Sequence, residues 1–140
     1  MICFWDVIEH VANPQELLHQ CRQLLKPDGV LLLETQNVDS LWARLTGRKW
    51  QHFKHEEHIY HFTPETIVRI LEDCGFAIAH ETARFGGKFV SCAFIAERAW
   101  RLHPLMGVLF KPLAVGGGFN FYLNLRDELI VAARPQSLGS

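Results

Sequence analysis

Three side chains able to exchange protons or to bind a cation follow the first apolar run of the sequence. The run Ile2–Trp5 ends at Asp6, and Glu9 and His10 follow within the next four residues. Histidine is the side chain that titrates closest to neutrality, so His10 is a candidate general base. The alternative is structural, because acidic residues at the start of a helix stabilise it through the helix dipole. The sequence alone leaves both interpretations open.

Four histidines recur at intervals of three residues, at His52, His55, His58 and His61. A zinc site is the first hypothesis for such a row, but the spacing opposes it. Each step of three residues drifts by about 60° around an α-helix, and in a strand successive steps point to opposite faces. No cysteine lies nearby to complete a tight structural site. Two of the histidines can meet, whereas convergence of all four is not expected.

The elements that would position these residues follow from capping and apolar patterns. Asn13, Pro14 and Glu16 predict the start of a helix, and the turn Lys26–Gly29 predicts its end. Val30–Leu33 is continuously apolar, as in a strand buried on both faces of a parallel sheet.

The same order repeats further along the chain. Thr63 caps a helix that Gly75 ends. The other expected elements are helices over Leu41–Leu45, Phe89–Leu102 and Leu105–Val115, and strands over Phe76–Thr82 and Leu129–Ala133. This alternation predicts an α/β fold with a parallel sheet and helices on both of its faces.

Several of these segments carry motifs in a characteristic order. Trp5–Val11 contains an acidic-x-x-Glu-His pattern, and Leu24–Leu32 contains a Leu-Leu-Lys-Pro-x-Gly turn before an apolar strand. The further matching segments are Thr35–Asn37, Glu57–Thr63, Cys74–Phe76 and Asn124–Glu128. Together they resemble the class I S-adenosylmethionine-dependent methyltransferases, in particular the branch with the ubiquinone-type O-methyltransferases. The resemblance covers nearly the whole chain.

The resemblance implies both a fold and a place within it. The family has a Rossmann-like α/β sheet of seven strands, and this chain looks like the C-terminal half, strands four to seven, without the first three. The Gly-rich loop and the acidic residue that hold most of the cofactor find no match, since Gly116–Gly118 and Gly86–Gly87 lack a surrounding strand-turn-helix unit. We expect residues 1–135 to form a partial methyltransferase domain with a variable helical insertion at Gly86–Gly118, and residues 136–140 to form a tail.

The function implied by the resemblance is methyl transfer from S-adenosylmethionine to a small-molecule acceptor, with O-methylation favoured. Trp5 and Asp6 would border the cofactor, because ligands of open α/β sheets collect at the carboxyl ends of strands. His10 would be the catalytic base. A chain that is half of the domain is expected to be inactive alone. A non-catalytic α/β module that pairs with another chain is the rival interpretation.

The second catalytic candidate is His58, which matches the family's Glu-His before the Phe-Thr helix cap. Trp50 and Tyr60 are the expected walls of the acceptor pocket. In the ubiquinone-type branch the acidic-x-x-Glu-His pattern places a divalent metal, which here would use Asp6, Glu9 and His10. That metal is not favoured, because this chain has Asp where the branch has Glu and the shorter side chain reduces the reach.

Charge and composition restrict the partners. A formal net charge of -1 over 140 residues argues against a general nucleic-acid surface. The basic and aromatic residues that cluster locally are balanced by Glu56 and Glu57 and are expected to form a solvated face or a grip on a small anionic acceptor; they are Arg44, Arg48, Lys49, Trp50, Phe53 and Lys54. Four scattered cysteines suit reduced thiols in a cytoplasmic protein.

Two surfaces could still mediate contacts. Residues 102–125 carry a single charge, Lys111, but prolines and glycines interrupt them, so a membrane span is not expected and an interfacial contact stays open. With the first strands missing, Ile2–Trp5 would lie at an edge of the sheet. An apolar edge strand without Lys or Pro predicts self-association through that edge.

Overall fold

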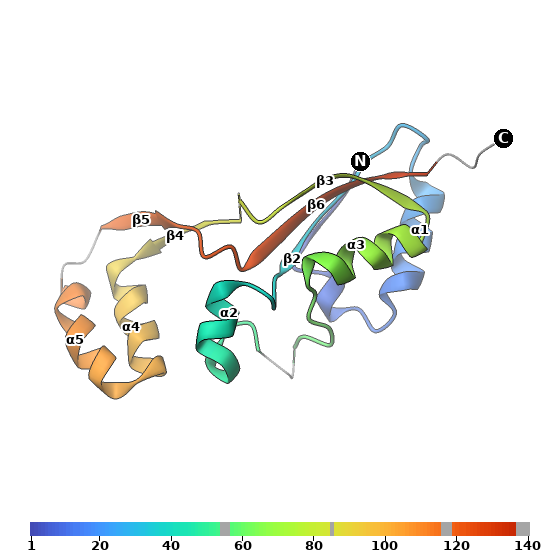
Figure 1. Ribbon diagram of the computed structural model, residues 1–140. Coiled ribbons are helices and arrows are strands. Elements are labelled where there is room, and N and C mark those ends of the chain that lie inside the picture. Colours follow the sequence, from blue (N-terminus) through green and yellow to red (C-terminus); the bar gives the residue numbers. More distant parts are fainter. Residues whose placement is uncertain (54–56, 85, 116–118, 137–140) are drawn as a thin grey trace.

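The computed structural model describes residues 1–53, 57–84, 86–115 and 119–136. Its main sheet contains four strands in the order β1-β2-β6-β3, namely β1 (Ile2–Trp5), β2 (Leu31–Gln36), β6 (Glu128–Pro135) and β3 (Phe76–Thr82). The α/β fold expected from the sequence is thus confirmed (Figure 1).

The expectation of a fully parallel sheet is wrong for the last strand. β1 and β2 run parallel, whereas β6 is antiparallel to both β2 and β3. The cause is the connection: the segment after β3 leaves the sheet and returns at the same end, so β6 must run back beside β3. Figure 1 shows this return at the end of the sheet nearest α2.

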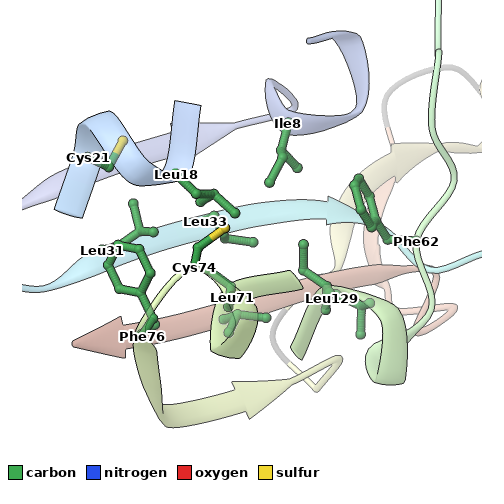
Figure 2. Packing of buried hydrophobic residues seen from close by; sticks show 13 residues of the cluster. Ile8, Leu18, Cys21, Leu31, Leu33, Phe62, Leu71, Cys74, Phe76 and Leu129 are labelled. Carbon is green, nitrogen blue, oxygen red and sulfur yellow. The ribbon is translucent and has the colours of Figure 1, made fainter. Parts of the chain in front are cut away.

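Two helices cover one face of the sheet. Asn13 caps α1 (Pro14–Leu24) by accepting from the Glu16 backbone N–H, and Thr63 and Thr66 form a capping box at α3 (Pro64–Asp73). Figure 2 shows their buried side chains meeting those of the sheet. The residues that form this core are Ile8, Leu18, Cys21, Leu31, Leu33, Phe62, Ile67, Leu71, Cys74, Phe76, Leu129, Val131 and Ala133.

Helices on both faces were expected, and for the described residues this is wrong. The β1–α1–β2 and β2–α3–β3 connections both step across the sheet in the same direction. Because such crossovers share one hand, both helices fall on the same face. The opposite face of β1 is open, with Cys3 exposed and Trp5 53% exposed.

The segment between β3 and β6 forms a lobe beside the sheet (Figure 1). It contains β4 (Lys88–Ser91), α4 (Cys92–Leu102), α5 (Pro104–Val115) and β5 (Asn120–Leu123). The helix predicted over Phe89–Leu102 is wrong for its first residues, because β4 pairs with β5 and Ser91 caps the helix that follows. No helix within the described ranges is long and apolar enough to cross a membrane.

The remaining elements are short. α2 (Leu41–Thr46) and the single-turn helix η2 (Gly47–Lys49) follow β2, and another single-turn helix, η1 (Ile8–His10), follows β1. Asn37 bridges to Phe62 directly after β2, which draws the loop before α3 against the carboxyl ends of β1 and β2.

Candidate functional site

The turn after β1 and the loop before α3 meet at the carboxyl end of the sheet. The backbone N–H groups of Ile59 and Tyr60 donate to the Glu9 carbonyl at 2.8 and 3.1 Å. This contact brings His10 and His58 together, with ring centroids 4.7 Å apart and the rings edge to face. The two catalytic candidates therefore share one site.

Both imidazoles are anchored through the same ring nitrogen. His10 Nδ1 lies 2.5 Å from the Glu57 carbonyl oxygen, and His58 Nδ1 lies 2.8 Å from the His52 carbonyl oxygen. A carbonyl only accepts, so Nδ1 donates in each ring and Nε2 of the neutral ring keeps its lone pair. His10 is 38% exposed at its side chain, whereas His58 is buried. His10 can thus meet a molecule from solvent.

Glu9 holds this turn to β2 rather than stabilising α1. Its side chain is fully buried and accepts from the Thr35 hydroxyl at 2.9 Å and from the Gln36 side-chain amide. The structural alternative placed Glu9 in the acidic first turn of the next helix. This placement is wrong, because Glu9 lies in η1 and α1 begins only at Pro14.

The potential metal ligands gather differently from the set considered in the sequence. One ligand atom each from Glu9, His10 and His58 lies within 4.8 Å of the others. Asp6 accepts instead from the Gln36 amide at 3.5 Å. Each Glu9 carboxylate oxygen accepts one hydrogen bond, which is compatible with metal ligation, since carboxylates that bind metals are themselves hydrogen-bonded.

Trp5 and Asp6 lie at the carboxyl end of β1, as the sequence predicted. Trp5 pairs in register with Glu34, which places both side chains on the open face of the sheet. Its 53% exposure rules out the alternative that Trp5 is a core residue. Asp6 has φ of 51°, so the chain turns sharply where β1 ends. The open face thus ends in an aromatic ring and two carboxyl groups.

A buried carboxyl group of β6 adjoins this face. Glu128 is ion-paired with Lys88, yet burial and a hydrogen bond with Glu34 raise the pKa of Glu128 to about 7. Burial alone would lower the pKa of Lys88, but the pairing with Glu128 raises it. Neither Glu34 nor Glu128 was identified from the sequence, because their proximity depends on the non-local β2–β6 register.

A second carboxylate, Asp127, supports the histidine loop. Its side chain is buried and lies 3.7 Å from His52 Nε2. Burial would raise the pKa of Asp127, but the neighbouring His52, a backbone hydrogen bond and the charge of Lys88 together outweigh burial and lower that pKa. His52 in turn stacks on His58, with centroids 6.4 Å apart. Asp127 therefore steadies the ring beside the catalytic candidate.

The described histidines of the row, His52, His58 and His61, pack against one another. His58 lies 6.0 Å from His61 between ring centroids, and His61 Nε2 faces the His52 carbonyl oxygen at 3.4 Å. His55 falls outside the described residues. Two or more histidines of the row do meet, through ring packing and a shared carbonyl.

The expected pocket walls have different environments. Trp50 is 2% exposed and packs against His52, Phe53 and His61. Tyr60 is 37% exposed and donates its hydroxyl to the Ala12 carbonyl at 3.1 Å. Trp50 is therefore buried among the rings of the histidine loop, whereas Tyr60 is partly exposed and bound to the turn before α1.

Two described cations of the basic cluster bind different partners. Arg44 pairs with Asp39 at 2.8 Å, and Lys49 donates to the Leu102 carbonyl. Lys54 and Glu56 lie outside the described residues. The described cations of the cluster thus have separate partners, and the expected solvated face or grip on a small anionic acceptor stays a prediction.

The fold and the site define an α/β domain that gathers polar side chains at the carboxyl ends of its parallel strands. Comparison with known proteins then gives the family. Residues 1–81, more than half of the chain, match the family described as "Methyltransferase domain". The chain belongs to this methyltransferase family.

Curated relatives and solved structures agree with this assignment. The chain is 33% identical over 76 residues to the ubiquinone biosynthesis O-methyltransferase of Dinoroseobacter shibae, covering 50% of this chain and 31% of that protein. The enzyme of the same name from Cereibacter sphaeroides is 40% identical over 47 residues, 32% of this chain and 19% of that protein. The chain therefore spans about a third or less of these relatives.

The solved structures support the fold. An S-adenosylmethionine-dependent methyltransferase from Mesorhizobium loti aligns with TM-score 0.53 and 18% identity, over 94% of this chain and 59% of that one. A methyltransferase from Thermotoga maritima, described as a possible histamine N-methyltransferase, aligns with TM-score 0.55 and 12% identity, over 96% and 55%. The Rossmann-like methyltransferase fold is thereby shown for nearly the whole chain.

Proposed function

We propose that this chain takes part in S-adenosylmethionine-dependent methyl transfer to a small-molecule acceptor, with an oxygen as the favoured acceptor atom. The observation that carries the proposal is the His10–His58 pair, anchored through both Nδ1 atoms beside the carboxyl end of β1. The names of the curated relatives support oxygen as the acceptor atom.

The residues at the end of β1 fit the implied cofactor. S-adenosylmethionine carries a sulfonium and an ammonium group, and exposed aromatic faces and carboxylates attract such cations. Trp5 and Asp6 supply one of each, and Glu34 lies in register beside Trp5. When bound, the cofactor supplies a methyl group that is already activated for transfer. Trp5 and Asp6 would hold its amino-acid end.

The chain's own residues would then prepare the acceptor. The Nε2 atom of His10 accepts the proton of an acceptor hydroxyl, which makes the oxygen nucleophilic. His58 packs edge to face on His10 and fixes the orientation of its ring. The carbonyl of Glu57 stabilises the resulting imidazolium, since it already accepts from Nδ1. Tyr60, partly exposed on the loop that carries His58, would contact the acceptor.

The position of the chain within the family fold is also part of the proposal. Its four-stranded sheet would correspond to strands four to seven, and the solved structures, of which the chain covers 55% and 59%, support this. The complete domain would then bind most of the cofactor outside these residues. We accordingly expect the 140-residue chain alone to be inactive.

The test is methyl transfer by the protein purified from its source at its natural length. Radiolabelled S-adenosylmethionine and a panel of phenols, carboxylic acids and amines would reveal the product. Label on phenolic oxygen supports the proposal. Absence of transfer to every acceptor class, together with calorimetry that detects no cofactor binding, would instead favour the non-catalytic module.

A further inference from the structure

An apolar cavity of about 240 Å³ lies between α2 and the helices of the lobe. Apart from Gln51 and Arg98, the side chains that line it are apolar. They include Trp42, Phe94, Ile95, Met106, Phe110 and Leu123. Typical ligand pockets measure roughly 300–1,000 Å³, so this cavity suits a short apolar chain rather than a large ring system.

One charged side chain, Arg98, lines the cavity. The Arg98 guanidinium lies over the Phe94 ring at 4.9 Å, and its buried Nε atom makes no hydrogen bond. The Glu97 carboxylate approaches that atom only to 3.7 Å, while it binds Arg101 at 2.5 Å. The Arg98 side chain is 33% exposed as a whole, but its Nε–H is buried beside an apolar cavity without a hydrogen bond, which favours an anion as its partner.

A smaller adjoining cavity extends the positive charge. It measures about 30 Å³, shares Gln51 and Arg98 with the first cavity, and is also lined by Lys49 and Arg101. Among the described residues lining either cavity, none is acidic. The apolar interior and the cationic rim together complement a molecule with an apolar chain and an anionic end.

Gln51 connects this cavity to the histidine site. Its side-chain nitrogen lies 3.1 Å from His52 Nε2, and His52 stacks on His58. A molecule seated in the cavity would therefore lie beside the loop that carries His58.

We propose that the cavity binds the apolar chain of an amphipathic carboxylic acid and that Arg98 binds its carboxylate. The identification of this molecule as the methyl acceptor, or as part of it, rests on the proposed function. The proposed binding of the carboxylic acid rests only on the cavity and on the Arg98 Nε–H group that makes no hydrogen bond.

Octanoate and octanol are matched probes, with the same chain length and different charge. Calorimetry on the natural-length protein should show saturable octanoate binding. Arg98→Gln should weaken it roughly 10- to 100-fold, as expected for loss of a charge-assisted bond. Octanol should bind the parent and Arg98→Gln equally. Arg69→Gln, at an exposed position on α3, is the control and should bind octanoate like the parent.

A second variant tests the apolar part. Met106→Trp narrows the cavity from its half-exposed rim and should weaken both probes, with an unchanged thermal transition as the check on folding. Equal octanoate affinity of Arg98→Gln and Arg69→Gln would overturn the proposal. So would binding of the protein to phosphatidylglycerol vesicles without saturable octanoate binding, which would assign the apolar lobe to a membrane surface.

The outcome is separable from that of the proposed function. Saturable, Arg98-dependent octanoate binding in a protein that transfers no methyl group supports the cavity and contradicts the methyl-transfer proposal. Methyl transfer by a protein that does not bind octanoate supports the enzyme and contradicts the cavity.

Discussion

The rings of His10 and His58 meet edge to face with their centroids 4.7 Å apart, although one follows β1 and the other precedes α3. Each donates through Nδ1 to a backbone carbonyl. The fold therefore fixes both tautomers and directs the unprotonated Nε2 atoms to other partners. His10, the more exposed of the two, is the one that can reach an acceptor.

Replacement of His10 by alanine tests the base directly. In the protein that transfers methyl groups, His10→Ala should lower turnover by roughly 10²- to 10⁴-fold, the usual contribution of a general base. Cofactor affinity should remain, because Trp5 and Asp6 are unchanged. The measurement is kcat with labelled cofactor, alongside calorimetry of cofactor binding.

His19→Ala is the matched control, since His19 is exposed on α1, outside the site. It should retain full turnover. If His10→Ala also stays within a few-fold of the parent, His10 has only a structural role.

Chelation separates a base mechanism from a metal mechanism. Glu9, His10 and His58 could converge on an ion, but Asp6, the first acidic residue of the pattern, contacts Gln36 instead and lies outside this set. We expect turnover to be unchanged after EDTA treatment and dialysis. Loss of activity that magnesium or zinc restores would contradict this and assign the three residues to a metal.

Most of the main fold was predictable because its signals are local. The caps at Asn13 and Thr63 and the apolar run before Glu34 gave helices and strands close to those observed. The direction of β6 and the strand at Lys88–Ser91 were not predictable in this way. Both depend on pairing with distant segments, and no local pattern determines such pairing.

The same distinction applies to the site. His10, His58, Trp5 and Asp6 stand in motifs and could be proposed from the sequence. Other polar residues lie near these four only because of the sheet register and the loop before β6. They are Glu34, Gln36, Asp127 and Glu128. Gln36, Asp127 and Glu128 lie within matching segments as well, but no local pattern indicates which residues they contact, and Glu34 lies outside those segments.

The buried Glu9 carboxylate should contribute measurably to stability. Glu9→Ala would leave the Thr35 hydroxyl buried without its acceptor, which costs about 1–3 kcal/mol, and would leave the Gln36 amide with only its 3.5 Å contact to Asp6. Urea denaturation should show this loss. Glu65→Ala, at an exposed position in the first turn of α3, is the control and should change the free energy of unfolding by less than about 0.5 kcal/mol. Equal effects of the two variants would contradict the role of Glu9.

Glu128 should make stability depend on pH. In the folded protein its pKa is raised to about 7 from 4.5, so between these values the folded state holds a proton that the unfolded state has lost. Stability should therefore fall as pH rises from about 4.5 to 7, by up to about 3 kcal/mol from this group. The variant Glu128→Gln lacks the carboxyl group that titrates, so it serves as the comparison.

Unfolding free energies at pH 5 and pH 7.5 provide the measurement. The loss between the two values should be smaller in Glu128→Gln than in the parent, because the other titrating groups remain. An identical loss in both proteins would mean that Glu128 ionises normally.

The 140-residue chain should associate through β1. In the part of the chain that the structure describes, β1 and β3 are the two edges of the main sheet. β1 contains no Lys or Pro to block pairing, and its open face exposes Cys3 and half of Trp5. Such an edge offers unpaired backbone groups beside apolar side chains, which favours strand pairing with a second copy.

Light scattering of the purified chain should therefore report a dimer or larger species. Cys3→Lys places a charge on the exposed face of β1 and should shift the population to monomer. Ala77→Lys makes the same kind of change at an exposed position of β3, the opposite edge, and should leave association unchanged. If only Ala77→Lys dissociated the protein, the interface would be assigned to β3, because each variant blocks a different edge of the sheet. A monomeric parent with a sharp thermal transition would show that β1 does not drive association, and would mean that the open face and edge are tolerated by a self-sufficient fold.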